Sequence, residues 1–270
     1  MYLSNSPALI DPMKQFSHLK FARRWFILAC CSLSILACNK PPQILSHEVI
    51  STRPHDPSAF TQGLQLVGGR LFESTGQYGA STVREVDPLT GKILRSRALS
   101  AREFGEGLTH FKNELWVLTW KEQTVHVFDP DSLKPLRKFN YQGEGWGLTN
   151  DGNDLIMSNG SDVLQWMNAS DFSVVRRVHV TDAGNPVNML NELEWVNGEI
   201  FANIFMTERI ARIDPKSGRV TGWLDLKNLR SQLAKPHRAE VLNGIAHDAK
   251  TGNFLITGKY WPALFEVQVR

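Results

Sequence analysis

Glu106 stands between two glycines in the stretch FGEGL, residues 104–108, and a related stretch, GEGWGL, follows at 143–148. A carboxylate in this setting is either solvated in a crowded turn or placed to meet a substrate as an acid or base. In the second case the glycines would leave room for the substrate. Asn191 and Lys259 are expected to reach the same rim, and three such groups together are hard to explain as packing. Glu106, Asn191 and Lys259 are therefore the candidate catalytic groups.

Aromatic side chains accompany these polar groups in successive copies of a sequence repeat. Rings that converge on one mouth form an apolar pocket that holds little water and few polar groups. Each ring taken alone is explained as well by packing between strands. The aromatic candidates are Phe60, Phe104, Trp120, Trp146, Trp195, Phe205 and Trp261, and the amide of Gln62 lies among them.

The elements that must position these residues follow from two repeated phrases. A marker tripeptide occurs five times, as QGL at 62–64, EGL at 106–108, WGL at 146–148, NEL at 191–193 and NGI at 243–245. An Asp-Pro phrase places Asp87, Asp129 and Asp214 in tight turns between strands, because proline fixes φ and the carboxylate bonds the backbone ahead. A degenerate copy, MNASDFSVV, fills the missing slot near residue 168.

A period of 40 to 50 residues with about four strands in each copy predicts an all-β fold, a five-bladed β-propeller. The innermost strands would line a central channel, and the marker tripeptides would gather at one mouth of it. The last copy, 243–270, contains only three strands, and the orphan strand 47–55 would supply the fourth and close the ring. The non-repeating insert 226–240 is expected to form a short surface helix.

The N-terminal segment has the layout of an export signal. Four Lys/Arg precede an apolar run over residues 25–37, which is shorter than the about 20 residues of a membrane span. The run ends at Ile35-Leu36-Ala37-Cys38, which resembles the lipobox of bacterial lipoproteins. The pattern predicts cleavage before Cys38 and acylation of this cysteine, and a plain secretory signal is the alternative.

The expected domain organisation is a signal peptide over 1–37, a linker over 38–46 and a catalytic propeller over 47–270. We expect an exported protein that is anchored by lipid to the bacterial envelope, in the periplasm or on the cell surface, without other membrane contact. Met13 opens a signal of more typical length, so the sequence leaves open whether translation starts at Met1 or Met13.

Composition narrows the classes of partner and chemistry. The first 37 residues account for the whole net charge of +3, and residues 38–270 carry 26 basic and 26 acidic side chains. Nucleic-acid binding needs a clustered basic excess and is not expected. All three cysteines fall at or before Cys38, which excludes disulfides from the folded domain. The scattered histidines show no zinc-binding spacing, which argues against a catalytic zinc.

Nearly the whole chain after the signal resembles the glutaminyl-peptide cyclotransferases of the plant and bacterial type. The resemblance is carried, in order, by HDPSAFTQGL, LFESTGQYG, FGEGLT, LTW, GEGWGLTNDG, NELEWVNGEIFANI and LNGIAHD with TGKYWPALFEV. It implies a five-bladed propeller that converts N-terminal glutamine of peptides and proteins to pyroglutamate and releases ammonia. It implies no cofactor for catalysis and allows a structural calcium in the channel, whose ligands the sequence does not name. We expect a monomer.

The resemblance also assigns roles to the candidate residues. Glu106 would carry the proton from the α-amine to the leaving nitrogen, and Asn191 and Lys259 would donate hydrogen bonds to the γ-carbonyl oxygen as it becomes negative. Phe205 stands where the family often has tryptophan, and Glu144 of GEGWGL receives no catalytic role and is interpreted as a channel or turn residue. The substrate-binding residues would be Phe60, Gln62, Phe104, Trp120, Trp146 and Phe205.

Two alternatives from other classes remain open. A non-catalytic propeller could bind peptide termini or scaffold an envelope complex, because one fold serves many functions. The joint presence of Glu106, Asn191 and Lys259 argues against it. A propeller hydrolase of lactones or sugars usually needs a channel metal or an arginine cluster, and the sequence shows neither. The physiological substrate, the preferred second residue and the membrane leaflet do not follow from the sequence.

Overall fold

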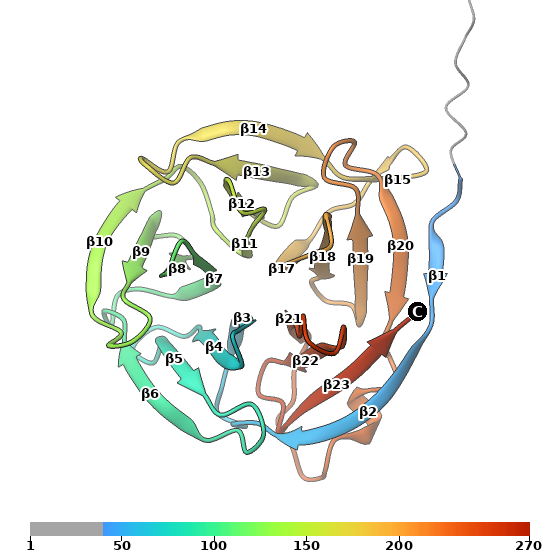
Figure 1. The fold of residues 1–270 in the computed structure, drawn as a ribbon, viewed down its shortest axis with the longest axis horizontal. Helices are drawn as coiled ribbons and strands as arrows, with labels where there is room; N and C mark the ends of the chain where they lie inside the picture. The colour runs from blue at the N-terminus through green and yellow to red at the C-terminus, as the bar shows by residue number, and fades with distance from the viewer. Residues whose placement is uncertain (1–39) are drawn as a thin grey trace, which may run out of the picture. The chain divides into compact units, whose positions relative to one another are not determined.

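Residues 40–270 are described by the computed structural model, and they form five blades arranged around one centre (Figure 1). This architecture is the five-bladed β-propeller that the repeats predict. The expected signal peptide and the acylation site at Cys38 lie outside the described residues. Within residues 40–270, no helix is long and apolar enough to cross a membrane.

Each blade is built on four antiparallel strands, and the sheet of blade 4 gains a fifth strand at its outer edge. Blade 1 contains β3 (Thr61–Val67), β4 (Arg70–Thr75), β5 (Thr82–Val86) and β6 (Ile93–Ala98). Blade 2 contains β7 (Gly105–Phe111), β8 (Glu114–Thr119), β9 (Thr124–Phe128) and β10 (Pro135–Asn140). Blade 3 contains β11 (Leu148–Asn150), β12 (Leu155–Met157), β13 (Val163–Met167) and β14 (Val174–His179).

The last two blades follow the same plan. Blade 4 contains β17 (Leu190–Val196), β18 (Glu199–Ile204), β19 (Arg209–Ile213) and β20 (Val220–Asp225). Blade 5 contains β21 (Leu242–His247), β22 (Phe254–Gly258), β23 (Ala263–Val269) and β2 (His47–Pro54). A small hairpin, β15 (Thr181–Asp182) and β16 (Asn185–Pro186), lies between blades 3 and 4 in the chain.

Inner and outer strands differ in burial, as a propeller requires. The inner strand β7 is buried at six of its seven residues, whereas the outer strand β2 alternates between half-buried and exposed along its whole length. An inner strand is covered by neighbouring blades on both faces, while an outer strand presents one face to solvent. The inner strands contact one another in the order β3, β7, β11, β17, β21, and β21 contacts β3.

The fifth blade combines strands from both ends of the chain (Figure 1). The N-terminal strand β2 pairs antiparallel with the C-terminal strand β23, with Val49 opposite Val267. Beyond the ladder, the N–H of His55 donates to the carbonyl of Pro262 at 3.0 Å. The outer edge of β23 is therefore covered by the segment that the sequence analysis identified as an orphan strand.

The segment predicted as a linker is partly ordered into the fold. Residues 43–45 form β1 (Gln43–Leu45), which pairs in parallel with β20 and places Leu45 opposite Leu224. The side chain of Leu45 is buried among apolar residues of blades 4 and 5. The part of the predicted linker that includes Leu45 therefore belongs to the folded domain. A strand of three residues is too short to be predicted from an alternating pattern of apolar and polar residues.

The insert at 226–240 does not form the predicted surface helix. Within the insert the structure has a single turn of 3-10 helix, η1 (Arg230–Gln232). Leu226, Leu229 and Leu233 have helix-like spacing in the sequence, but all three are buried in the core shared with blade 5. The apolar pattern reflects docking of an irregular loop, so the helix prediction was wrong.

The Asp-Pro phrases form the tight turns that the sequence predicts. The carboxylate of Asp87 accepts hydrogen bonds from the backbone N–H groups of Leu89 and Thr90, both at 2.9 Å. Asp129 and Asp214 accept equivalent bonds from the residues ahead of them. The side chain of Asn168 does the same in the degenerate copy, through the N–H of Ser170. Each turn joins the third and fourth strands of its blade.

The recurring glycines allow neighbouring inner strands to approach closely. A Cβ atom built on Gly107 would lie 2.4 Å from the backbone nitrogen of Leu148 in the next blade. One built on Gly147 would lie 2.0 Å from the carbonyl oxygen of Asn191 in the blade after that. Such distances exclude any side chain. Gly107 is therefore required for strand packing, which is one of the two explanations that the sequence leaves open for the glycines of FGEGL.

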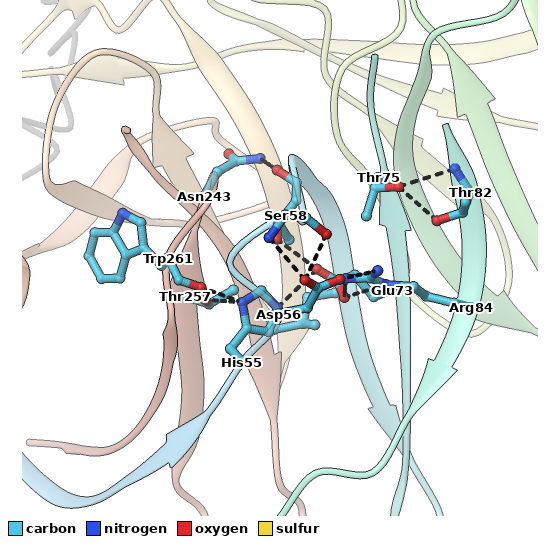
Figure 2. Close-up of polar contacts among 12 residues, drawn as sticks. His55, Asp56, Ser58, Glu73, Thr75, Thr82, Arg84, Asn243, Thr257 and Trp261 are labelled. Carbon is cyan, nitrogen blue, oxygen red and sulfur yellow. Dashed lines mark hydrogen bonds and ion pairs between the residues drawn. The ribbon is translucent and has the colours of Figure 1, made fainter. Parts of the chain in front are cut away.

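A buried charged cluster joins the N-terminal segment to blade 1 (Figure 2). The Glu73 carboxylate accepts hydrogen bonds from Arg84 at 2.7 Å and Thr61 at 2.6 Å and lies 3.1 Å from the ring nitrogen Nε2 of His55. The other ring nitrogen of His55 lies 2.8 Å from the carbonyl oxygen of Trp261, in blade 5. One carboxylate thus ties residues from three separate parts of the chain together.

Opposite charges dominate the titration of this cluster. Burial alone would raise the pKa of Glu73, but the charges of Arg84 and His55 outweigh it and hold this pKa far below its usual range. Burial alone would lower the pKa of His55, but the Glu73 carboxylate outweighs it, so the pKa of His55 is raised. Ionised Glu73 stabilises the fold above its unfolded pKa of 4.5, and protonated His55 does so below 6.5.

Replacing Glu73 by glutamine is expected to lower the free energy of unfolding by about 3 to 5 kcal/mol, because the buried Arg84 and His55 would lose the carboxylate they share and Arg84 would keep only the partly exposed Asp56. The loss should be largest between pH 4.5 and 6.5, where both charged partners contribute, and smaller on either side. Urea denaturation of both proteins across this range measures it. Glu114→Gln, which breaks a more exposed pair with Arg137, is the control and should have a much smaller effect.

Candidate active site

A cavity of about 290 Å³ opens where the ends of the inner strands meet. Each of the five blades contributes at least one residue to its wall. The structure brings together all nine residues that the sequence analysis assigned to catalysis or substrate binding. They are Phe60, Gln62, Phe104, Glu106, Trp120, Trp146, Asn191, Phe205 and Lys259.

The two other aromatic candidates lie outside this cavity. Trp195 packs against the apolar core shared by blades 3 and 4. Trp261 is fully buried in the core of blade 5, where its indole N–H donates to the carbonyl of Glu240 at 2.9 Å. These two rings are packing residues, as the alternative explanation for single aromatics allowed.

Three of the four polar lining residues stand where the inner strands are irregular, and the fourth, Lys259, follows β22. The pairing of β3 with β4 shifts register between Thr61 and Gly63, on either side of Gln62. The same kind of shift flanks Glu106 in β7 and Asn191 in β17. An extra residue in one strand bends it and re-aims its side chain. The irregularity therefore explains how residues of the inner strands direct polar groups into the cavity.

Glu106 is only 5% exposed, and one of its carboxylate oxygens, Oε1, accepts a hydrogen bond from the side-chain amide of Gln62 at 2.8 Å. Burial raises the pKa of Glu106 well above its usual range. The charge of Lys259 opposes this shift, and the charges of Glu144 and Glu122 reinforce it. A carboxyl group with a raised pKa can both accept and return a proton near neutral pH, which is the requirement for an acid–base catalyst.

Lys259 is buried against aromatic rings. Its ammonium nitrogen lies 4.4 Å from the ring centre of Phe60 and 5.0 Å from that of Phe205. Burial lowers the pKa of Lys259, while the carboxylates of Glu106 and Glu240 act in the opposite direction. Cation–π contacts hold the ammonium in a site with little water, where a positive charge acts strongly on a neighbouring negative charge.

Asn191 presents a hydrogen-bonding group that the protein itself leaves unused. Its side chain is 2% exposed, and its carbonyl oxygen Oδ1 has no partner among the described residues. The backbone carbonyl of Asn191 accepts a hydrogen bond from the hydroxyl of Ser158 at 2.7 Å, which fixes the strand there. A buried amide oxygen without a partner among the described residues, at a cavity wall, is available to accept a hydrogen bond from a polar ligand.

The aromatic lining is held by edge-to-face contacts. The ring of Phe104 meets that of Phe60 with centroids 5.9 Å apart and that of Trp120 with centroids 5.6 Å apart. In the wall contributed by blades 3 and 4, Trp146 meets Phe205 with centroids 5.5 Å apart and the rings nearly perpendicular. Phe205 therefore fills its place in the wall, although it offers no indole N–H. Contacts of this type give the walls a defined shape.

Sequence reasoning missed the contribution of Asn243. Its side-chain amide donates to Oε1 of Gln62 at 3.2 Å and to the backbone carbonyl of Thr61 at 3.0 Å. These bonds leave the Gln62 amide nitrogen facing Glu106, so a chain of amides orients the carboxylate. The marker NGI at 243–245 carried a signal, because its Asn is equivalent to Gln62, Glu106 and Asn191 in the other markers.

Glu144 also contributes to the site. Its oxygen Oε2 accepts hydrogen bonds from the indole N–H groups of both Trp120, at 2.8 Å, and Trp146, at 3.0 Å. From the sequence alone, this residue is interpreted as a channel or turn residue. The similarity of GEGWGL to FGEGL points to Glu144 as a residue near the site, but it does not tell a residue inside the cavity from one behind its wall.

Two carboxylates of the inner strand of blade 4 are bound by backbone amides. Glu192 accepts the N–H of Leu64 at 3.3 Å and that of Ile245 at 2.8 Å, and Glu194 accepts the N–H of His247 at 2.9 Å.

Within residues 40–270, no cluster of three or more His, Cys, Asp or Glu is placed to hold a metal ion. The structural calcium that the resemblance allows stays a prediction.

Comparison with known proteins places the chain in a family. Residues 24–269 match the family described as glutamine cyclotransferase. The chain belongs to the glutamine cyclotransferase family. It is 41% identical over 227 residues to a glutaminyl-peptide cyclotransferase of Arabidopsis thaliana, a match that covers 83% of this chain and 71% of that protein.

A solved structure of a glutamine cyclotransferase relative agrees with the fold. The crystal structure of Myxococcus xanthus glutaminyl cyclase superimposes with a TM-score of 0.80 at 35% identity, covering 84% of this chain and 98% of that one. The family match includes all nine residues of the cavity. The chain is accordingly an enzyme with a transferase activity, and its cavity is the candidate active site of this cyclotransferase.

Proposed function

We propose that this enzyme converts the N-terminal glutamine of peptides and proteins to pyroglutamate in the cavity, with Glu106 as its acid–base catalyst. One observation carries the assignment: a single buried carboxyl group lines an aromatic cavity, with one oxygen bonded to Gln62 and its pKa raised. Glutamine has an apolar stem that fits between rings and two polar ends that need few partners.

The reaction needs one proton to move from one nitrogen to another. The α-amine nitrogen attacks the γ-carboxamide carbon, a C–N bond forms, and the carbonyl electrons move onto oxygen. Glu106 accepts the proton that the attacking nitrogen loses and donates it to the amide nitrogen. The bond to that nitrogen breaks, ammonia leaves, and the carbonyl of the five-membered lactam re-forms. Since Oε1 is occupied by Gln62, the second oxygen of Glu106 would handle the proton.

The negative charge that develops on the γ-carbonyl oxygen requires fixed partners. Lys259 supplies a buried positive charge at the cavity wall, and the side-chain N–H₂ group of the buried Asn191 would donate a hydrogen bond to this oxygen. Groups that are oriented before the reaction stabilise such an intermediate without reorganisation. The aromatic walls would keep the glutamine side chain folded so that amine and carboxamide stay in reach of each other.

Removing metal ions is expected to leave turnover unchanged, because every step of this mechanism uses side chains of the protein. Ammonia release from the dipeptide Gln-Ala should be equal with and without a strong chelator. A loss of activity with chelator that zinc restores would contradict the mechanism. Melting temperature in the same samples separates a structural ion from a catalytic one, because loss of a structural calcium would lower it.

We also propose that the protein acts as an exported, lipid-anchored monomer, on the basis of the sequence pattern that ends at Cys38. Cells fed a clickable fatty acid should label the wild-type protein, and Cys38→Ser should remove the label and leave an unprocessed precursor. Absence of label on the wild-type protein, with a mature N-terminus elsewhere, would contradict the anchor. Stable attachment by lipid requires more than one acyl chain.

A further inference from the structure

We propose that Glu144 is a positioning residue that fixes two neighbouring aromatic walls of the active site at once. Its single oxygen Oε2 accepts the indole N–H groups of Trp120 and Trp146, which come from different blades. The proposal deepens the function proposed for the cavity and rests on it.

Neither indole is locked by burial, since both rings are only partly covered. Outside the cavity, the ring of Trp120 carries the ammonium of Lys121 at 3.9 Å, and the ring of Trp146 lies against Gly160. These contacts, and the edge-to-face contacts with Phe104 and Phe205, hold the ring surfaces but involve neither indole N–H group. A charged acceptor on both N–H groups fixes the orientation of the two rings, because hydrogen bonds to a carboxylate are short and directional.

The backbone around Glu144 is fixed as well. The N–H of Gly145 donates to the carbonyl of Trp120 at 3.2 Å, and a Cβ on Gly145 would lie 2.3 Å from the hydroxyl of Tyr141. Gly143 adopts a φ of 86°, which favours glycine. The GEG segment therefore places the carboxylate, and the carboxylate places the indoles. This order explains why a glutamate recurs between glycines in GEGWGL although it does not line the cavity.

The same carboxylate influences the acid–base group. The charged groups that act on Glu106 are Lys259, which lowers its pKa, and Glu144 and Glu122, which raise it. The charge of Glu106 in turn contributes to raising the pKa of the Tyr78 and Tyr141 hydroxyls. Glu144 thus couples the shape of the pocket to the proton affinity of its catalyst.

The test compares Glu144→Ala, Glu144→Gln and Glu122→Gln with the wild type. The indole N–H resonances of Trp120 and Trp146 are first assigned from the proton–nitrogen spectra of Trp120→Phe and Trp146→Phe. In Glu144→Ala both resonances should move to higher field while those of the other tryptophans stay. The value of kcat/KM for Gln-Ala should fall roughly 10- to 100-fold, mainly through KM.

Glu144→Gln keeps a carbonyl oxygen that can accept the indole N–H groups, so its KM should lie close to that of the wild type. A general loss of folded structure in the Glu144 variants would not be rescued in this way. Both Glu144→Gln and Glu122→Gln remove a negative charge, so the acid limb of activity should move to lower pH in each. Only the Glu144 variants should move the two indole resonances. Unmoved resonances in both Glu144 variants, or an unchanged KM in folded Glu144→Ala, would overturn the proposal.

The outcome is separable from that of the proposed function. The indole resonances and the rescue by Glu144→Gln report on Glu144 alone, whereas the catalytic role of the cavity depends on Glu106. Should Glu144→Ala fail to fold, the spectrum and pH profile of Glu144→Gln decide the question. A pH profile identical to wild type, with both resonances in place, would refute the proposal.

Discussion

Glu106→Gln should lose about 10²- to 10⁴-fold in kcat while it remains folded, because the amide keeps the size of the side chain and cannot carry a proton. Its melting temperature should stay the same or rise. A carboxyl whose pKa is raised in the fold opposes folding once pH exceeds its unfolded value of 4.5, and a neutral amide removes this penalty. Ammonia release and thermal melting, measured on one preparation, give both quantities.

A packing role for Glu106 predicts the opposite pattern. In that case Glu106→Gln would lose several degrees of melting temperature and keep its turnover. Gln62→Glu would not serve as a control, because it puts a second carboxyl beside the first. Asp131→Asn is suitable, since it removes an exposed carboxylate from blade 2 and should change neither quantity. Near-normal turnover in folded Glu106→Gln would exclude this residue from the mechanism.

Lys259→Met should lower kcat roughly 10²- to 10³-fold, as expected when a fixed group that stabilises developing charge is removed. Methionine keeps an apolar stem between Phe60 and Phe205, so the wall of the cavity is preserved. The loss of the positive charge also raises the pKa of Glu106 further, since Lys259 opposes its shift. The acid limb of the pH profile should therefore move to higher pH.

The effect of Lys259 should appear in kcat more than in the affinity for substrate, because the charge it stabilises exists only in the transition state. Steady-state kinetics with Gln-Ala, in parallel with those of Asn191→Ala, measure this division. Lys121→Met removes a lysine from the outer face of Trp120 and provides the matched control. An equal loss in both lysine variants would indicate a general field effect, contrary to the role assigned to Lys259.

The sequence repeats predicted the fold because each blade has the same order of strands and turns and packs against its neighbours in the same way. The marker tripeptides identified the inner strands, and the Asp-Pro phrases identified the outer turns. The short strand β1 and the loop at 226–240 escaped prediction because their burial depends on contacts with distant strands. Leu45 and Leu229 are buried by residues far away in the sequence, which no local pattern records.

The candidate site was predictable to the extent that it uses the repeat. Gln62, Glu106 and Asn191 occupy equivalent positions next to irregularities of the inner strands, so one repeat position identifies all three. The roles of the partners behind them were not predictable. Asn243 occupies the same repeat position, but its bond to Gln62 requires the closed ring, and the bonds of Glu144 depend on how two indoles of blades 2 and 3 are placed. For the glycines of FGEGL the sequence left packing and substrate access open, and the structure shows that strand packing requires both glycines.

The pH dependence of kcat/KM in wild type and Glu106→Gln tests the central claim most directly. If Glu106 and the substrate amine together must hold one proton, the wild-type profile is bell-shaped, with limbs that belong to the pair. In Glu106→Gln the residual activity, after subtraction of spontaneous cyclisation, should keep only the single limb of the substrate amine. A bell of unchanged shape and position in the variant would show that another group carries the proton and would contradict the account.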